Sequence, residues 1–414
     1  MLPFALVADG ICLVLPTMKP PARALQDPVK PGVRQAPRVH FGAGIWQRPA
    51  PAAAAVQAAK EVAPSFAAAG WQTAGAQRLQ LQQDRSLQAL GGATMGTTWS
   101  LRLVNPGYAP LAPVQALVQS TLDEVIAQMS NWEPDSRLSR FNAAAPGSWH
   151  GLPAELAQVI DAALHWAQAC GGAWDPTVGA LVALWGYGPR AQPQQAHSGQ
   201  LPSDAEIAQA LRHCGYQKLQ WEPAQRRLWQ PGGLQLDLSG IAKGFAVDWV
   251  VQRLQAAGWQ HGLLEIGGEI LGWGRRPDGQ PWRVAVAGLP PEVQGSATPE
   301  AVPLQGGALA TSGDHWHVFT QGGRRYSHTI DPRTGQPVAH ALTSITVFHA
   351  ACMHADALAT VLTVLGPQAG WDFALAQNVA AVFHTHPDTA HPQGQRCSTP
   401  AWDGRFASAG GLGQ

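Results

Sequence analysis

The sequence predicts an α+β fold, and two observations along its 414 residues support this class. Segments whose apolar residues repeat with the helical period of about 3.6 residues interleave with short runs that have the character of strands. The two kinds of segment follow each other without the regular strand–helix–strand rhythm of a doubly wound parallel sheet. With 45% hydrophobic residues, the chain can form a sizeable core. We therefore expect mixed sheets with helices packed against them.

The charge balance and the cysteines exclude several classes of protein. Lysine plus arginine and aspartate plus glutamate number 27 each, so the formal net charge is zero. A neutral chain gives no electrostatic reason to expect nucleic acid as a partner. No apolar run approaches the roughly 20 residues that cross a bilayer, so we expect no transmembrane segment. The five cysteines are scattered without a CxxC pair, which predicts neither a disulfide framework nor a zinc site.

The two ends of the chain differ in composition from its middle. Residues 1–88 are rich in Ala, Pro and Gln without a sustained period, and we expect a mostly disordered leader. Residues 386–414 are dominated by His, Pro, Gly, Ser and Gln, and we expect a flexible polar tail. The folded domain is therefore predicted to span residues 89–385.

The first elements of this domain follow from periodicity and from stop signals. Residues 97–104 have the pattern of a strand. Apolar residues spaced by three and four predict an amphipathic helix over 112–130. A second helix is predicted over 153–170, because Pro153 suits its first turn and the pair Gly171-Gly172 stops it.

The later helices are marked at one of their ends. The segment Ser203-Asp204-Ala205-Glu206 has the pattern of a capping box and opens a third helix. A further helix is predicted over 242–257, and another over 355–365 is ended by Gly366-Pro367. The short strands that we expect lie at 217–222, 226–230, 233–238, 262–266, 282–287, 315–320, 324–329 and 342–349.

Glycine and single polar residues gather where loops meet helices or strands. The most informative case is Leu236–Gly244, in which a strand end at Asp237 leads through a glycine-containing turn into a helix. The backbone N–H groups of that helix N-terminus, together with the side chain of Lys243, favour an anion such as phosphate. The glycine spacing is not that of a Walker loop.

Asp356 and Thr360 are the second chemical feature. They lie four residues apart on a predicted helix, so their oxygen atoms face the same side. A hard cation such as Mg²⁺ prefers oxygen ligands of this kind, together with phosphate oxygens and water. A carboxylate in the first turn of a helix also complements the helix dipole, and this structural alternative for Asp356 remains open.

Three further segments allow two interpretations each. Gly92–Thr98 lets the backbone approach a ligand closely, or forms a tight turn before a strand. In Met129–Ser136, Trp132 is either a core residue or a stacking platform. Ala173–Thr177 is either part of a ligand site or a turn held by a hydrogen bond to Asp175.

Taken in order, these segments resemble the ApbE family of FAD:protein FMN transferases. The resemblance covers roughly residues 91–385, and the shared order of its motifs argues against a chance match. The matching stretches are ATMGTTW, MSNWEPDSRLSRFN, WDPTVGALVALWGYG, LDLSGIAKGFAVD, EIGGEI, ATSGDHW, YSHTIDPRTGQPV and ADALATVLTVLG.

The resemblance implies an enzyme that binds FAD in a cleft between lobes. With Mg²⁺, such an enzyme transfers the FMN half of FAD to a Thr or Ser hydroxyl of another protein and releases AMP. The family's metal ligands fall on Asp356, Thr360 and the main-chain carbonyl of Gly240, and its candidate base matches His328. Its FAD contacts fall on Met95, Trp132, Ala173, Trp174, Asp175, Asp237, Lys243 and Ile330.

The chemistry of these residue types agrees with the implied reaction. Attack on a pyrophosphate needs neutralisation of the developing charge, which Mg²⁺ and Lys243 supply. The acceptor hydroxyl must lose a proton, and histidine, the residue type at position 328, is suited to taking it near neutral pH. Aromatic side chains can stack on the isoalloxazine ring. The sequence has no Rossmann fingerprint, and this mode of FAD binding does not need one.

Two positions depart from the family pattern. Trp132 stands where Tyr is more frequent, so a hydroxyl is missing while an aromatic ring remains. This change bears on the balance between transfer to protein and plain hydrolysis of FAD. Glu269 stands where Asp is frequent, which lengthens a contact. Two alternatives are therefore kept: an FAD pyrophosphatase that releases FMN and AMP, and a flavin-binding accessory protein without turnover, against which the retained metal ligands and base argue.

The resemblance also implies a partner and leaves the compartment undecided. The expected acceptor is a redox or respiratory protein that carries an Asp-x-x-(Ser/Thr)-Gly-Ala-(Ser/Thr) motif. Many members of the family are exported or membrane-anchored, which would place the chain in the periplasm or at the inner membrane. However, residues 1–17 lack a basic n-region, and Cys12 follows Gly10-Ile11, unlike a lipoprotein cleavage site.

Overall fold

An antiparallel sheet of eight strands forms the centre of the fold in the computed structural model. Its strand order is β1-β2-β6-β7-β10-β15-β16-β17. The strands span Leu87–Thr94 (β1), Thr97–Val104 (β2), Gly262–Ile266 (β6), Glu269–Trp273 (β7), Gly307–Gly313 (β10), Leu342–His349 (β15), Ala380–Thr385 (β16) and Arg396–Ser398 (β17). The structure describes residues 86–189, 201–286, 300–313, 318–321, 324–387, 391 and 394–406.

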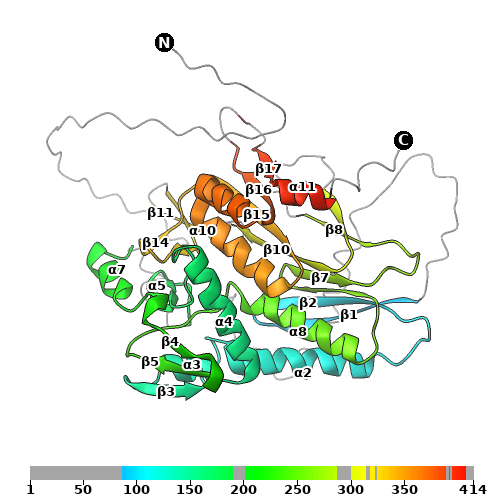
Figure 1. The fold of residues 1–414 in the computed structure, drawn as a ribbon, viewed down its shortest axis with the longest axis horizontal. Helices are drawn as coiled ribbons and strands as arrows, with labels where there is room; N and C mark the ends of the chain where they lie inside the picture. The colour runs from blue at the N-terminus through cyan, green and yellow to red at the C-terminus, as the bar shows by residue number, and fades with distance from the viewer. Residues whose placement is uncertain are drawn as a thin grey trace, which may run out of the picture. The chain divides into compact units, whose positions relative to one another are not determined.

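One face of this sheet is covered by helices (Figure 1). They are α2 (Ala112–Met129), α4 (Ala154–Ala169), α8 (Ala242–Ala256) and α10 (Cys352–Ala376). Helices α8 and α10 contact the sheet and each other, while α2 packs against α8 and α4 against α10. Alternate residues of β2, namely Trp99, Leu101 and Leu103, are buried in the same core as these helices. The period-two pattern of the strand therefore directs one set of side chains toward the helical layer.

The opposite face of the sheet carries a smaller apolar cluster. Ala308 and Ala310 of β10 belong to the helical core, whereas Leu309 between them belongs to this second cluster. Because successive strand residues point to opposite faces, the second cluster lies on the other side of the sheet. Trp282 and Trp402 contribute its largest side chains. They come from β8 (Trp282–Ala285), which pairs with β9 (Ala301–Leu304), and from helix α11 (Pro400–Phe406).

Shorter elements surround these layers. A three-stranded sheet has the order β3-β5-β4, and two hairpins pair β11 with β12 and β13 with β14. Among the described residues no helix is both long and apolar enough to cross a membrane. The remaining elements are β3 (Ser148–Gly151), β4 (Gln220–Glu222), β5 (Arg227–Gln230), β11 (Val318–Gln321), β12 (Arg324–Ser327), β13 (Ile330–Asp331), β14 (Gln336–Pro337), α3 (Arg137–Asn142), α5 (Gly179–Leu184), α7 (Asp204–Leu211), η1 (Tyr216–Lys218) and η2 (Pro223–Gln225).

Most of the predicted helices are confirmed. The helices expected over 112–130, 153–170 and 242–257 correspond to α2, α4 and α8 within one or two residues at each end. The capping box of α7 is complete, because Ser203 Oγ accepts the Glu206 N–H at 3.3 Å and a Glu206 carboxylate oxygen accepts the Ser203 N–H at 2.8 Å. The predicted α+β class is also confirmed.

Several sequence-based predictions are wrong or need correction. The strand predicted over 217–222 forms only at Gln220–Glu222, because Tyr216–Lys218 is a 3-10 helix. The strand predicted over 233–238 does not form, because Asn142 and Pro176 take the backbone hydrogen bonds of Leu236 and Asp237 in place of a neighbouring strand. The prediction of a flexible polar tail is wrong for residues 396–406. These residues form β17 and α11, and Trp402 among them is buried. The leader is expected to end at residue 88, but β1 already begins at Leu87, and residues 1–85 lie outside the described part of the chain.

Helix α10 contains a kink at the predicted stop signal. Gly366 has φ 79° and ψ −175°, a backbone conformation that side chains other than glycine rarely adopt. Pro367 has no N–H, so the carbonyl of Thr363 loses its helical donor. His340 Nε2 lies 2.5 Å from that carbonyl and donates to it. The helix predicted over 355–365 therefore ends where expected, and a second helical segment continues to Ala376.

We expect the substitution Gly366→Ala to lower the free energy of unfolding by about 1–3 kcal/mol, because alanine is strained at this φ and ψ. The matched control is Gly404→Ala in α11, where the glycine is helical and an added Cβ meets nothing within 4 Å. That control should be neutral or stabilise by up to about 1 kcal/mol. Urea unfolding of both variants measures the difference, and equal losses would contradict this account of the kink.

Candidate active site

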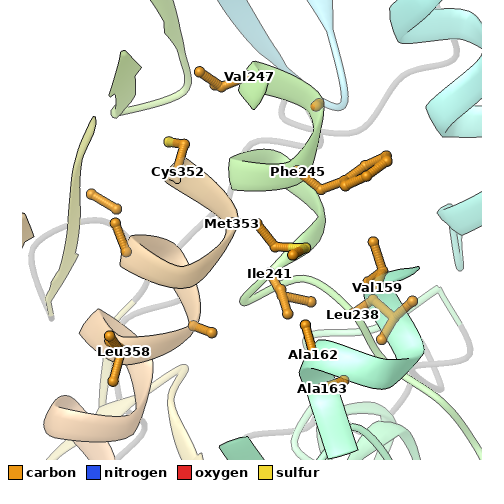
Figure 2. Packing of buried hydrophobic residues seen from close by; sticks show 14 of the residues in the cluster. Val159, Ala162, Ala163, Leu238, Ile241, Phe245, Val247, Cys352, Met353 and Leu358 are labelled. Atoms are coloured by element: carbon orange, nitrogen blue, oxygen red, sulfur yellow. The ribbon is translucent and has the colours of Figure 1, made fainter. Parts of the chain in front are cut away.

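The candidate site lies where the first turn of α8 meets the first half of α10. The chain enters α8 through a turn whose apolar residues Leu238 and Ile241 are buried. Figure 2 shows Met353 of α10 pointing toward Ile241, with Ala162 of α4 on the other side. This apolar contact fixes the backbone of the turn, which carries Asp237 and Gly240, against α10.

Helices α8 and α10 touch at their backbones. A Cβ added at Gly244 of α8 would clash with the Cys352 carbonyl and would lie 2.8 Å from Asp356 Cβ, so only glycine allows this approach. The Gly244 N–H donates to Asp356 Oδ2 at 3.0 Å. Asp356 is only 5% exposed. The carboxylate is therefore bound to the N-terminal turn of α8 and does not stand free on the surface of its own helix.

The three predicted metal ligands come together at this point. Thr360 lies one turn after Asp356, and its hydroxyl donates to the Asp356 carbonyl at 3.3 Å. A Cβ added at Gly240 would lie 3.0 Å from Thr360 Oγ1 and 2.9 Å from Trp174 Nε1. The set offers one carboxylate, one hydroxyl and one carbonyl, which are oxygen ligands of the kind that Mg²⁺ prefers. In the described part of the chain, no group of three or more His, Cys, Asp or Glu side chains could hold a metal.

An ion pair lies beside this oxygen set. Lys243 Nζ is 2.5 Å from Glu269 Oε2, and Glu269 is only 2% exposed. Burial lowers the pKa of Lys243, but the negative charges of Glu269 and Asp356 raise it by more, so the pKa lies above its usual value. Burial raises the pKa of Asp356, and the Lys243 charge opposes that rise. The charge of Lys243 thus acts on both buried carboxylates, while its Nζ contacts that of Glu269.

The residues predicted to face the flavin have mixed surroundings. The side chain of Trp132 is 45% exposed. This exposure excludes the interpretation of Trp132 as a core residue. Asp237 is buried, and its carboxylate accepts the Asn131 side-chain amide at 2.9 Å and the Ser239 N–H at 2.8 Å. Asn131 therefore links the segment that carries Trp132 to the turn before α8.

The run Ala173–Asp175 is buried, and its members differ in role. Trp174 reaches the site, because its Nε1 lies next to Gly240. Asp175 Oδ1 accepts the N–H and the hydroxyl of Thr177 at 2.8 and 2.7 Å, and its Oδ2 accepts the Tyr216 N–H at 2.8 Å. Burial raises the pKa of Asp175, and these hydrogen bonds oppose the rise. The turn interpretation of this segment is confirmed, and Asp175 holds the local backbone.

Three predicted residues lie on other elements. Met95, with φ 45°, is in the turn between β1 and β2 and packs against the main core. His328 follows β12, and its ring stands edge-on to Tyr187 with centroids 6.3 Å apart. Ile330 is buried in a third apolar cluster with Leu181. Their assignment to the same site as Asp356 remains a prediction.

Sequence reasoning missed two polar residues that organise this region. Asn131 directly precedes Trp132 within the recognised stretch MSNWEPDSRLSRFN, and this place is its signal in the sequence. Asp248 of α8 accepts the backbone N–H groups of Cys352 and Met353 at 2.7 and 2.8 Å. It ends the LDLSGIAKGFAVD motif, and this place in a recognised stretch is the only signal that could have found it.

A half-buried histidine, His354, lies in the first turn of α10. Trp166 Nε1 donates to His354 Nδ1 at 3.0 Å. Burial, followed by the charges of His349 and His165, lowers the pKa of His354 to about 4. The unfolded chain binds a proton at this residue near pH 6.5, whereas the folded protein resists it. Stability from this group is therefore present above pH 6.5 and is lost as the pH falls toward about 4.

We expect the variant His354→Gln to weaken this pH dependence in the metal-free protein, because glutamine can still accept from Trp166 but does not titrate. The measurement is the urea midpoint at about pH 7.5 and about pH 5 for parent and variant. Substitution of the exposed His391 by glutamine is the matched control and should leave the difference between the two pH values unchanged. The same drop in parent and His354→Gln would contradict the prediction.

Comparison with known proteins gives consistent matches. The model of the ApbE family matches residues 95–383. A relative from Vibrio cholerae named FAD:protein FMN transferase is 38% identical over 300 residues, 72% of this chain and 87% of the relative. A relative of the same name from Haemophilus influenzae is 35% identical over 314 residues, 74% of this chain and 89% of the relative. The crystal structure of Pseudomonas stutzeri flavinyl transferase ApbE, in its apo form, matches with a TM-score of 0.69 and 36% identity, covering 77% of this chain and 96% of that one.

Proposed function

Because the chain belongs to the ApbE family, we propose how its own residues carry out the reaction for which its relatives are named. The chain is an enzyme that transfers FMN from FAD to a protein, so FAD is its substrate and a protein is its acceptor. The observation that carries the residue assignments is the convergence of Asp356, Thr360 and Gly240 beside the Lys243–Glu269 ion pair.

We assign Mg²⁺ to the oxygen set of Asp356, Thr360 and the Gly240 carbonyl. The fit is supported by the chemistry of the donors and by the close approach of Gly240 to the Thr360 hydroxyl, which a side chain at 240 would block. When bound, Mg²⁺ supplies positive charge to the pyrophosphate oxygens as negative charge develops on them. Burial raises the pKa of Asp356, so a bound cation would also stabilise the charged form of this carboxylate.

Lys243 binds and orients the diphosphate in this proposal. Its raised pKa keeps the ammonium protonated at neutral pH. Glu269 holds that ammonium in one direction through the ion pair. Because Glu269 is buried and Lys243 is partly exposed, Lys243 is the member of the pair that an anionic substrate can reach.

His328 removes the proton of the acceptor hydroxyl. The hydroxyl oxygen then forms a bond to the FMN phosphorus, the bond from that phosphorus to the bridging oxygen breaks, and AMP leaves. Trp132 supports the flavin by stacking, which its exposed ring allows, and Asp237 is held toward the same region by Asn131. The acceptor is proposed to be a redox or respiratory protein with an Asp-x-x-(Ser/Thr)-Gly-Ala-(Ser/Thr) motif.

The reaction can be tested with the full-length chain, FAD, Mg²⁺ and an acceptor domain that carries this motif. We expect the acceptor to gain the mass of one FMN and AMP to appear in equal amount. Omission of Mg²⁺ with EDTA present should abolish both products. AMP without a gain of mass would indicate hydrolysis of FAD, and bound FAD with neither product would indicate an accessory protein.

The roles of the metal ligand and the base can be separated by two variants. Asp356→Asn should lower transfer by more than about 100-fold, because the metal stabilises the transition state by several kcal/mol. The exposed Asp372, on the same helix, gives the control Asp372→Asn, which should retain parental activity. His328→Ala should slow transfer by about 10²–10⁴-fold and leave FAD affinity within about twofold. A loss of FAD affinity without slower chemistry would make His328 a binding residue.

A further inference from the structure

The N-terminus of α10 is capped by a residue of another helix. The N-cap residue, Ala351, offers no side-chain hydrogen bond, and the first turn of α10 has no acidic residue of its own. The carboxylate of Asp248 on α8 takes this place, with Oδ1 2.7 Å from the Cys352 nitrogen and Oδ2 2.8 Å from the Met353 nitrogen. A carboxylate at this position satisfies two backbone donors and complements the helix dipole.

This cap is one half of a reciprocal contact between the two helices. The N–H of Gly244 on α8 donates to Asp356 on α10. One turn further along α8, Asp248 accepts the N–H groups of Cys352 and Met353. Cys352 lies one turn before Asp356 on α10. These three hydrogen bonds join the two helices at and next to the close approach of Gly244 to α10. Together they fix how far α10 is shifted along α8, because a slide of either helix would break all three.

We infer that Asp248 is a positioning residue for the metal site. It holds the start of α10, and α10 presents both Asp356 and Thr360. One carboxylate oxygen of Asp356 accepts the Gly244 N–H. The directions of both carboxylate oxygens therefore depend on how the two helices are aligned. This inference rests on the proposed function, because it assumes that Asp356 and Thr360 hold a divalent ion.

The test is the affinity for Mn²⁺, measured by electron paramagnetic resonance of the free ion with FAD present and the acceptor absent. Asp248→Asn keeps the size of the side chain but removes its charge and one of its two acceptors. We expect about 10-fold weaker binding of Mn²⁺, the lower end of what is lost when a group that orients metal ligands is removed. FAD affinity without metal, measured by flavin fluorescence, should stay within about twofold.

Two controls separate positioning from general stability. Ser203→Ala removes the cap of α7, so it should lower the unfolding temperature and leave Mn²⁺ affinity unchanged. Asp356→Asn removes the proposed ligand itself. If Asp356→Asn binds Mn²⁺ as the parent does, or if the parent binds none, the metal assignment fails and the inference with it.

If Asp356→Asn loses Mn²⁺ affinity but Asp248→Asn keeps it, the metal assignment stands and Asp248 is only a structural cap. Should Asp248→Asn not fold, Asp248→Glu carries the test, since it retains the charge and displaces the carboxylate by one methylene. We expect that variant to bind Mn²⁺ more weakly than the parent, and parental affinity would overturn the inference.

Discussion

The hydrogen bond from Gly244 to Asp356 exists because α8 and α10 touch at their backbones. A larger residue at 244 would separate the helices and leave the Asp356 carboxylate buried without this donor. The apolar contacts of Ile241 and Met353 hold the same junction from the side of α4 (Figure 2). The placement of Thr360, Gly240 and the Lys243–Glu269 pair follows from this one approach, since each is attached to one of the two helices or to the strands beneath them.

The burial of charge in this junction explains its chemistry. A buried carboxylate is stable in its charged form only with a partner. Glu269 is paired with the ammonium of Lys243, and Asp356 accepts the Gly244 N–H. The sheet contributes Glu269 at the start of β7, and α8 contributes Lys243 in its first turn. These two charged groups are thus held by regular secondary structure, which positions side chains more rigidly than loops do.

The sequence predicts those parts of the fold whose signal is local. The capping box at Ser203 and the stop at Gly366-Pro367 depend on neighbouring residues alone, and both are found. The strand predicted over 233–238 fails because Asn142, far away in the sequence, takes its hydrogen bonds. The order of the eight-stranded sheet and the burial of Trp402 likewise depend on distant partners. In the site, the family motifs indicate Asp356 and Thr360, but Asn131 and Asp248 act only through contacts that periodicity cannot reveal.

The cap of α10 has a consequence for how the protein assembles. Asp248 and Cys352 are 104 residues apart in the sequence. A segment containing α10 therefore lacks its acidic cap until α8 has docked, and closing so long a loop is slow compared with forming a helix. The first turn of α10 is therefore capped only when both helices are in place, so the position of Asp356 and Thr360 depends on the completed fold and not on α10 alone.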